Sequence, residues 1–210
     1  MRRTKEIPSE AFQPLLEELR RKPLDTNFYR NSAGAGQSQA FGIVNRRSLS
    51  PDYSRNCWRR PYLYKLLLEF GEKYVPFDFT SITVNQNYKC NPHYDKSNGG
   101  ESFLVSFGFY EGGELEILEG ESKGKYDIRH KPILDDFSLI LHQVLPFKGE
   151  RYSLVYYNFF NPKWVLDVPP PSVIEEDGVY KFKRGDKVIE EGLDHFMWGN
   201  KNACFDVGFD

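Results

Sequence analysis

The sequence predicts a mostly β fold in which a double-stranded β-helix (jelly-roll) core is flanked by α-helices. Two helical patterns occupy the first third of the 210 residues, and short β-branched runs separated by Gly and Pro fill most of the rest. Many short strands after a pair of helices favour two antiparallel sheets packed face to face. We expect one domain, with 1–76 as a helical, basic support, 77–162 as the jelly-roll core and 163–210 as a C-terminal hairpin extension.

Each expected element follows from a local pattern. The segment 9–22 carries leucines at helical spacing after a Ser cap, and Pro23 ends it. Residues 31–42 are rich in Gly and Ser, which predicts a loop leading into a short strand at 39–44. Apolar spacing over 62–74 predicts a second helix. Further strands are expected at 79–88, 102–110, 113–120, 136–144 and 151–160, with a final hairpin at 178–192.

Turn residues indicate where these strands reverse. Glu111-Gly112-Gly113 predicts a tight turn, and Gly99-Gly100 predicts a plain turn. The segment 145–150, LPFKGE, is expected to join the last two core strands. Arg184-Gly185-Asp186 should form the turn of the final hairpin.

Composition limits the class of protein. Apolar residues make up 40% of the chain and aromatic residues 16%, so it can bury a core without disulfide or metal cross-links. Cys57, Cys90 and Cys204 are too few and too scattered for a disulfide framework, which predicts reduced thiols. No apolar run is long enough to span a membrane, and the first residues lack a signal-peptide pattern. We therefore expect a soluble intracellular protein without a membrane partner.

The formal net charge of −2 hides an uneven distribution. Residues 1–65 contain 13 Lys and Arg against 6 Asp and Glu, whereas the remainder contains 15 against 24. A basic third on an acidic body indicates an anionic partner such as nucleic acid, and a solvated surface explains it equally. The densest basic group, which is the candidate nucleic-acid contact, comprises Arg46, Arg47, Arg55, Arg59 and Arg60.

A histidine and an aspartate two residues apart begin the candidate site. Residues i and i+2 of a strand project to one face, so His93 and Asp95 should point together. A second histidine from another strand would complete the two-His, one-carboxylate triad typical of non-heme Fe(II) oxygenases. Taken alone, the pair is explained as well by a hydrogen bond at the surface. His142, on the predicted strand 136–144, supplies the second imidazole, on the same face as Ser138 and Ile140.

An arginine in the next apolar strand adds an anion-binding group. Arg151 and Ser153 should share one face of the strand 151–160. A guanidinium in such a strand is costly unless an anion neutralises it, and its planar fork suits a carboxylate. The Ser153 hydroxyl can add a third hydrogen bond. The alternative for Arg151 is a structural ion pair with Glu150 or Asp135.

From Phe79 to Asn158 these motifs together resemble the iron(II)- and 2-oxoglutarate-dependent dioxygenase superfamily. The resemblance lies in FTSITVNQNYKCNPHYD, SFGFYEGGELEI and DDFSLILHQVLPFKGERYSLVYYN. The stretch HQVLPFKGERYSLV, with FGIVNRR and RPYLYKLLLEFG ahead of the core, looks most like the branch that contains TET/J-binding-protein-type enzymes.

The resemblance implies a ligand set and a cosubstrate anchor. It makes His93, Asp95 and His142 the Fe(II) ligands and the catalytic centre. It gives Arg151, with Ser153, the role of binding the distal carboxylate of 2-oxoglutarate, with O2 as the other cosubstrate. One further contact to the cosubstrate is implied from the preceding strand, and the candidates are Asn85 and Asn87; a strand-edge amide is the alternative for either.

The implied reaction is hydroxylation of an unactivated C–H bond. The branch resemblance and the basic first third favour the methyl group of a modified pyrimidine in nucleic acid, whereas the acidic body favours a protein side chain, prolyl or other. A non-catalytic β-scaffold that binds a sugar or peptide is the third alternative, and the five intact core positions argue against it. His130, among charges, predicts a surface residue, and His195 a capping or tail residue.

Overall fold

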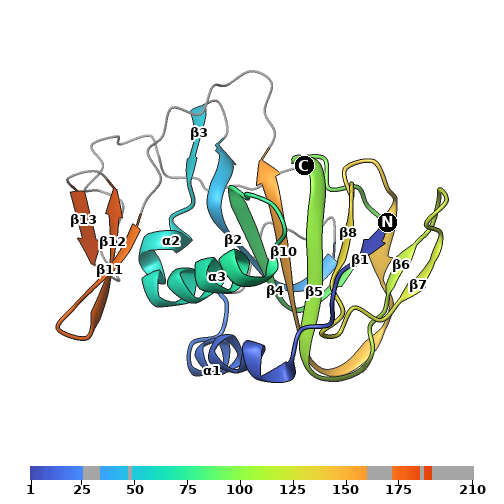
Figure 1. The fold of residues 1–210 in the computed structure, drawn as a ribbon, viewed down its shortest axis with the longest axis horizontal. Helices are drawn as coiled ribbons and strands as arrows, with labels where there is room; N and C mark the ends of the chain where they lie inside the picture. Colours follow the sequence, from blue (N-terminus) through green and yellow to red (C-terminus); the bar gives the residue numbers. More distant parts are fainter. Residues whose placement is uncertain (26–33, 47–48, 160–171, 185–186, 191–210) are drawn as a thin grey trace.

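A computed structural model describes residues 1–25, 34–46, 49–159, 172–184 and 187–190 (Figure 1). Its helices are a 3-10 turn, η1 (Ser9–Phe12), followed by α1 (Gln13–Arg21), α2 (Asn56–Arg59) and α3 (Pro61–Tyr74). The two predicted helices are confirmed. Pro14 lies in the first turn of α1 and Pro61 begins α3, positions where the missing N–H of proline costs no helical hydrogen bond. None of the helices described is long and apolar enough to cross a membrane.

The described strands form three sheets, which confirms the mostly β, jelly-roll fold class. The largest has the order β1 (Arg2–Arg3), β8 (Ile133–Asp135), β5 (Asn98–Gly112), β10 (Phe147–Phe159), β4 (Ser81–Cys90), β2 (Gly34–Arg46) and β3 (Leu49–Tyr53). A small sheet consists of β7 (Gly124–Tyr126), β6 (Leu115–Ile117) and β9 (His142–Val144). A third contains β11 (Ser172–Glu176), β12 (Val179–Arg184) and β13 (Lys187–Glu190).

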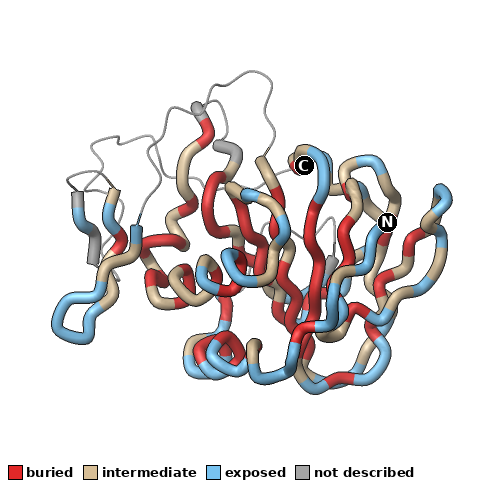
Figure 2. Tube along the Cα trace, in the orientation of Figure 1, coloured by how far each residue is buried: buried red, intermediate tan, exposed pale blue. Residues whose placement is uncertain are grey.

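The two faces of the large sheet pack against different partners. On one face, leucines of α1 and α3 pack against the central strands, where buried stretches are continuous (Figure 2). Tyr152, Leu154 and Tyr156 of β10 point to this face. On the other face, Leu104 of β5 packs with buried residues of β6 and β8, so the interior of the jelly roll lies between the large and small sheets. Alternation along β10 therefore places Arg151 and Ser153 toward the jelly-roll interior.

The strand predicted at 39–44 is confirmed as part of β2, but β2 begins at Gly34, so the predicted loop is wrong for residues 34–38. β2 pairs with β4 from Gly34 to Gly42, with a register shift between Ala35 and Gln37. Gly36 in this bulge has φ 129°, and a Cβ there would lie 2.4 Å from the Asn87 carbonyl oxygen. Glycine is thus needed for a bulged strand that approaches its neighbour closely. The large sheet accordingly extends beyond 77–162.

The strand predicted at 136–144 is confirmed only for β9 at its end and is wrong for 136–141, because the chain turns between β8 and β9. The Asp136 carboxylate accepts a hydrogen bond from the backbone N of Ser138 at 3.1 Å, and the Asp136 carbonyl accepts one from the N of Leu139 at 3.1 Å. Such local bonds compete with a sheet ladder. Ser138 and Ile140 therefore do not share a strand face with His142.

Other turn predictions are confirmed in part. Gly112 and Gly113 both have positive φ values, 74° and 73°, as the predicted turn requires. Gly99-Gly100 belongs to β5, and the turn lies at Lys96–Ser97 instead. Only Leu145–Pro146 separates β9 from β10, so most of the predicted connection 145–150 is strand.

The C-terminal extension forms the predicted hairpin with one additional strand, β11. Phe182 of β12 is fully buried and contacts the rings of Trp58 and Tyr64, so the extension packs against the helices. Of the predicted turn, Gly185 and Asp186 lie outside the described residues, as do His195 and Cys204. Neither Cys57 nor Cys90 forms a disulfide within the part of the chain that the structure describes.

Candidate active site

His93 and Asp95 lie in the connection between β4 and β5, not on a strand as predicted. Pro92 has no N–H to continue the ladder, and β4 ends at Cys90. His93 nevertheless forms a single antiparallel bridge to His142, with N to O distances of 3.0 and 3.1 Å in the two directions. The N of Asp95 donates to the Phe137 carbonyl at 2.9 Å. Backbone hydrogen bonds thus hold both ligand segments together.

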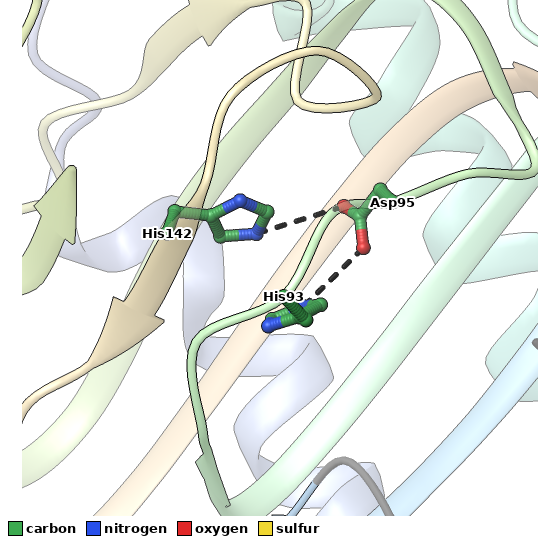
Figure 3. A group of neighbouring side chains, drawn as sticks. All are labelled: His93, Asp95 and His142. Atoms are coloured by element: carbon green, nitrogen blue, oxygen red, sulfur yellow. Dashed lines mark ion pairs between the residues drawn. The ribbon is translucent and has the colours of Figure 1, made fainter. Parts of the chain in front are cut away.

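The three side chains converge as the sequence predicts. One donor atom from each of His93, Asp95 and His142 lies within 4.8 Å of the others (Figure 3). Nε2 of His93 is 3.4 Å from Asp95 Oδ1, and Nε2 of His142 is 3.9 Å from Asp95 Oδ2. Two imidazole nitrogens and one carboxylate are a donor set that suits a divalent iron and leaves further coordination positions open.

The other nitrogen of each ring is fixed by the backbone. Nδ1 of His93 lies 2.8 Å from the Asn91 carbonyl oxygen, and Nδ1 of His142 lies 2.9 Å from that of Ile140. A carbonyl only accepts, so each Nδ1 donates a proton and each Nε2 faces the Asp95 carboxylate. Orientation of imidazoles through their second nitrogen is the usual arrangement around a metal.

The pKa values of the two histidines are shifted in opposite directions. Burial disfavours the charged form of His93, but hydrogen bonds to Asp95 and Cys90 raise its pKa to about 10. Burial lowers the pKa of His142. The Asp95 carboxylate stabilises a proton on the neighbouring imidazole. A metal ion bound by both groups would take the place of that proton, since metal binding displaces protons from its ligands.

Arg151 has two unsatisfied nitrogens in the jelly-roll interior. Its side chain is only 2% exposed, and Nε and Nη2 have no hydrogen-bond partner. The proposed ion pairs are absent, since Glu150 pairs with Arg20 and Asp135 with the N-terminal amine. An unpaired buried guanidinium is costly, and an anionic ligand would satisfy it.

Two aromatic rings and a glycine pack around the Arg151 side chain. The rings of Tyr110 and Phe147 lie 5.5 and 5.7 Å from its guanidinium carbon. At Gly113, an added Cβ would come within 3.0 Å of the Arg151 side chain, so glycine keeps that space clear. Cys90, at the end of β4, interacts electrostatically with both His93 and Arg151.

The two candidate asparagines differ in what their amides contact. Asn85 lies opposite Ser153 in the β4–β10 ladder, and its Nδ2 donates to Ser153 Oγ at 3.2 Å. Its Oδ1 is buried without a hydrogen-bond partner. Asn87 has φ 50°, and its Oδ1 accepts the backbone N of Arg151 at 2.9 Å. Asn85 therefore faces the anion site, whereas Asn87 ties two strands together.

Sequence reasoning missed several residues that support the site. Asn98 Nδ2 contacts Asp95 Oδ2 at 3.4 Å, and its backbone N donates to the Asp95 carbonyl at 2.9 Å. An asparagine three positions after the aspartate was a readable turn signal. Tyr110 reaches the site from β5 and Glu119 from the bend after β6, and nothing in their local sequence predicts that.

The basic group is not one surface. Arg60 is buried, lies 3.4 Å from Glu18 and donates to the Lys22 carbonyl, so its prediction as a nucleic-acid contact is wrong. Arg55 and Arg59 are half-buried at α2. Arg46 ends β2, and Arg47 lies outside the described residues. His130 is likewise not a free surface residue, because its ring stacks on Phe12 at 4.9 Å.

Comparison with solved structures places this fold among known ones. The chain is similar to NgTET1 in complex with 5mC DNA, with a TM-score of 0.52, 15% identity, and coverage of 73% of this chain and 69% of that one. A Pseudomonas putida prolyl-4-hydroxylase gives a TM-score of 0.48 at 17% identity, covering 76% and 92%. OsALKBH1 gives 0.45 at 16% identity, covering 75% and 100%. The first similarity shows a shared fold.

Comparison of the sequence with models of protein families gives no match, and comparison with curated proteins gives none either. The assignment of chemistry to this fold therefore depends on the site.

Proposed function

We propose that the protein is an Fe(II)- and 2-oxoglutarate-dependent dioxygenase that hydroxylates a C–H bond. The observation that carries the proposal is one combination: a His-Asp-His group whose donor atoms lie within 4.8 Å, together with a buried arginine that has two unpaired nitrogens. A metal centre or an anion site alone would fit many proteins. Both in one jelly-roll interior fit an enzyme that binds iron together with a dicarboxylate.

Each residue has a role in this reaction. When bound, Fe(II) supplies the redox chemistry by which O2 and 2-oxoglutarate become succinate, CO2 and a hydroxyl group on the substrate. His93, Asp95 and His142 hold the metal. Arg151 pairs with the distal carboxylate of 2-oxoglutarate, and Ser153 donates to it because its oxygen already accepts the Asn85 amide.

For the substrate we propose a methyl group on a modified pyrimidine in nucleic acid. The support is the resemblance of the sequence motifs, the excess of basic residues before residue 66, and the fold shared with a protein solved with 5mC DNA. A base in a duplex would have to leave the stack to reach the metal.

A protein side chain, prolyl or other, is the second candidate. The buried Arg60–Glu18 pair removes one arginine from the basic group, and the chain after residue 65 has more acidic than basic residues. Tight binding to a phosphate backbone needs several free cations, so this charge distribution favours a less anionic partner.

Turnover assays distinguish a nucleic-acid substrate, a protein substrate and a non-catalytic binding scaffold. The protein is loaded with Fe(II) without oxygen, exposed to air with 2-oxoglutarate, and offered methylated oligonucleotides and a peptide panel, with succinate and the gain of one oxygen measured by mass spectrometry. We expect succinate and an oxidised oligonucleotide. Oxidation of peptides alone would replace the nucleic-acid substrate. Absence of succinate, with Asp95→Ala giving the same trace, would favour a non-catalytic binding scaffold.

A further inference from the structure

Glu119 connects the two chain segments that carry the proposed metal ligands. One carboxylate oxygen, Oε1, accepts a hydrogen bond from the Tyr94 hydroxyl at 2.7 Å and another from the backbone N of Leu141 at 3.0 Å. Tyr94 lies between the first two ligands, and Leu141 immediately precedes the third. A single side-chain atom therefore contacts the immediate neighbours of all three.

Glu119 itself is held in place by the small sheet. The backbone N of Leu118 donates to the Leu141 carbonyl at 2.9 Å, next to the bond from Leu141 to Glu119. These bonds extend the pairing of β6 with β9, in which Ile117 lies opposite His142. The carboxylate is thus fixed relative to His142. Its hydrogen bond with Tyr94 in turn fixes the His93–Asp95 segment relative to His142.

The segment from His93 to Asp95 needs such support because it lies between strands. Its backbone contacts the small-sheet side through the bridge to His142 and the hydrogen bond from Asp95 to Phe137. The Tyr94 side chain, which is 37% exposed, adds a contact on the outer side of this segment. Metal affinity depends on ligands being held close to their bound geometry, so a contact that fixes one segment against the other raises affinity.

We propose that Glu119 is a positioning residue for the metal centre, holding the His93–Asp95 segment against His142 through Tyr94 and Leu141. This inference rests on the proposed metal site. Glu119 acts by joining the two segments through hydrogen bonds. Both bonds require a hydrogen-bond acceptor at Oε1, and neither requires the negative charge. Glutamine, whose carbonyl oxygen accepts in the same place, should therefore replace Glu119, whereas alanine should not.

A neighbouring pair offers a matched control. Glu116 accepts a hydrogen bond from Gln143 Nε2 at 2.7 Å, so it also joins β6 to β9 through a half-buried carboxylate. This bond joins Glu116 to Gln143 and does not involve the His93–Asp95 segment. Replacing Glu116 with alanine measures how weaker pairing of β6 with β9 alone affects metal affinity. Replacing Glu119 with alanine has this effect and also frees the His93–Asp95 segment.

The test measures metal binding without turnover. Mn(II), which occupies such sites without reacting with oxygen, is titrated by calorimetry into the full-length wild type and into Glu119→Ala, Glu119→Gln, Tyr94→Phe and Glu116→Ala, with thermal unfolding recorded alongside. We expect Glu119→Ala to weaken Mn(II) binding by about tenfold or more, the size typical of lost partners around ligands. Tyr94→Phe should weaken it less, and Glu119→Gln and Glu116→Ala should remain near wild type.

Several outcomes would overturn the inference. Equal affinity in Glu119→Ala and wild type would remove the role of Glu119 and leave the proposed enzyme intact. An equal loss in Glu116→Ala would reduce the effect to general loosening of the sheet. Failure of wild type to bind Mn(II) would refute both the metal site and this inference. If Glu119→Ala does not fold, Tyr94→Phe decides alone, and unchanged affinity there would contradict the link.

Discussion

The two faces of β10 differ in how their side chains are satisfied. Tyr152, Leu154 and Tyr156 meet helices and are fully buried among apolar neighbours, and the Tyr156 hydroxyl donates to the Leu67 carbonyl at 2.8 Å. Arg151 on the opposite face is equally buried, yet two of its nitrogens have no partner. A folded chain keeps polar groups unsatisfied only where something else meets them. One face therefore contributes stability, and the other is prepared for ligands.

The largest expected effect is on turnover, from substitutions of the metal ligands between β4 and β5 that leave the protein folded. Asp95→Ala or His93→Ala removes one of three metal ligands, so turnover should be lost altogether. Both side chains are half-buried outside the strands, so the free energy of unfolding should change by no more than about 1 kcal/mol. Lys96→Ala, an exposed change in the same connection, is the control. Wild-type turnover in either ligand variant would refute the ligand set.

The helix-covered face should respond in the opposite way. Leu154 is fully buried against the helices, and Leu154→Ala should lower the free energy of unfolding by about 2–5 kcal/mol, measured in urea, because it leaves a cavity. Val155→Ala, a partly buried neighbour on the ligand face, should cost less. The remaining folded Leu154→Ala protein should still bind Mn(II). If the two variants lose equal stability, the contrast between the faces is wrong.

Substitution of Arg151 should affect ligand binding and stability in opposite directions. Arg151→Met removes a buried charge with two unbonded nitrogens, so the ligand-free protein should be as stable as wild type or more stable. Affinity for 2-oxoglutarate should fall roughly 10–100-fold, since a charge-assisted hydrogen bond contributes about 1.5–3 kcal/mol. Thermal unfolding with and without 2-oxoglutarate measures both. Arg20→Met, an exposed arginine paired with Glu150, is the matched control.

A different result would show that Arg151 has a structural role and does not bind the cosubstrate. Clear destabilisation of ligand-free Arg151→Met, with an unchanged thermal shift on adding 2-oxoglutarate, would make the guanidinium a structural group. The anion site of the proposed function would then have to be sought elsewhere in the jelly-roll interior.

The contrast also explains which parts of the structure the sequence predicts. Alternation in RYSLVYYNF places Arg151 and Ser153 on one face and the large apolar residues on the other, as the structure has them. The convergence of His93, Asp95 and His142 is predictable from residue types and motif spacing, because a divalent metal requires a limited set of donors.

The failures come from interactions between distant or competing groups. FSLIL after Asp136 alternates like a strand, but the Asp136 side chain captures the N of Ser138 and forms a turn. The glycines before Gln39 resemble a loop until β4 is beside them to pair with. The separate roles of Asn85 and Asn87 depend on which strand each amide meets, which spacing along one strand cannot reveal.

The smallest expected effect tests how the helix-covered side tolerates charge. His130 is half-buried and stacks on Phe12, and burial, followed by the positive charge of Arg129, lowers its pKa from 6.5 despite Glu6, Asp127 and Glu10 nearby. The unfolded chain then takes up this proton more readily than the folded one. The stability contributed by neutral His130 is complete above about pH 7 and is lost as the pH falls through 6.5 toward the lower folded pKa.

Urea unfolding at pH 7.5 and 5.5 measures this contribution. Since the ring is partly exposed and solvent screens its charge, the change should stay below about 1 kcal/mol. His130→Asn removes the titrating group and keeps a residue type that tolerates the positive φ of 58°, so the difference in stability between the two pH values should shrink. A pH dependence as steep as that of wild type would show that the apolar side accepts this proton without penalty, and would weaken the distinction between the two faces.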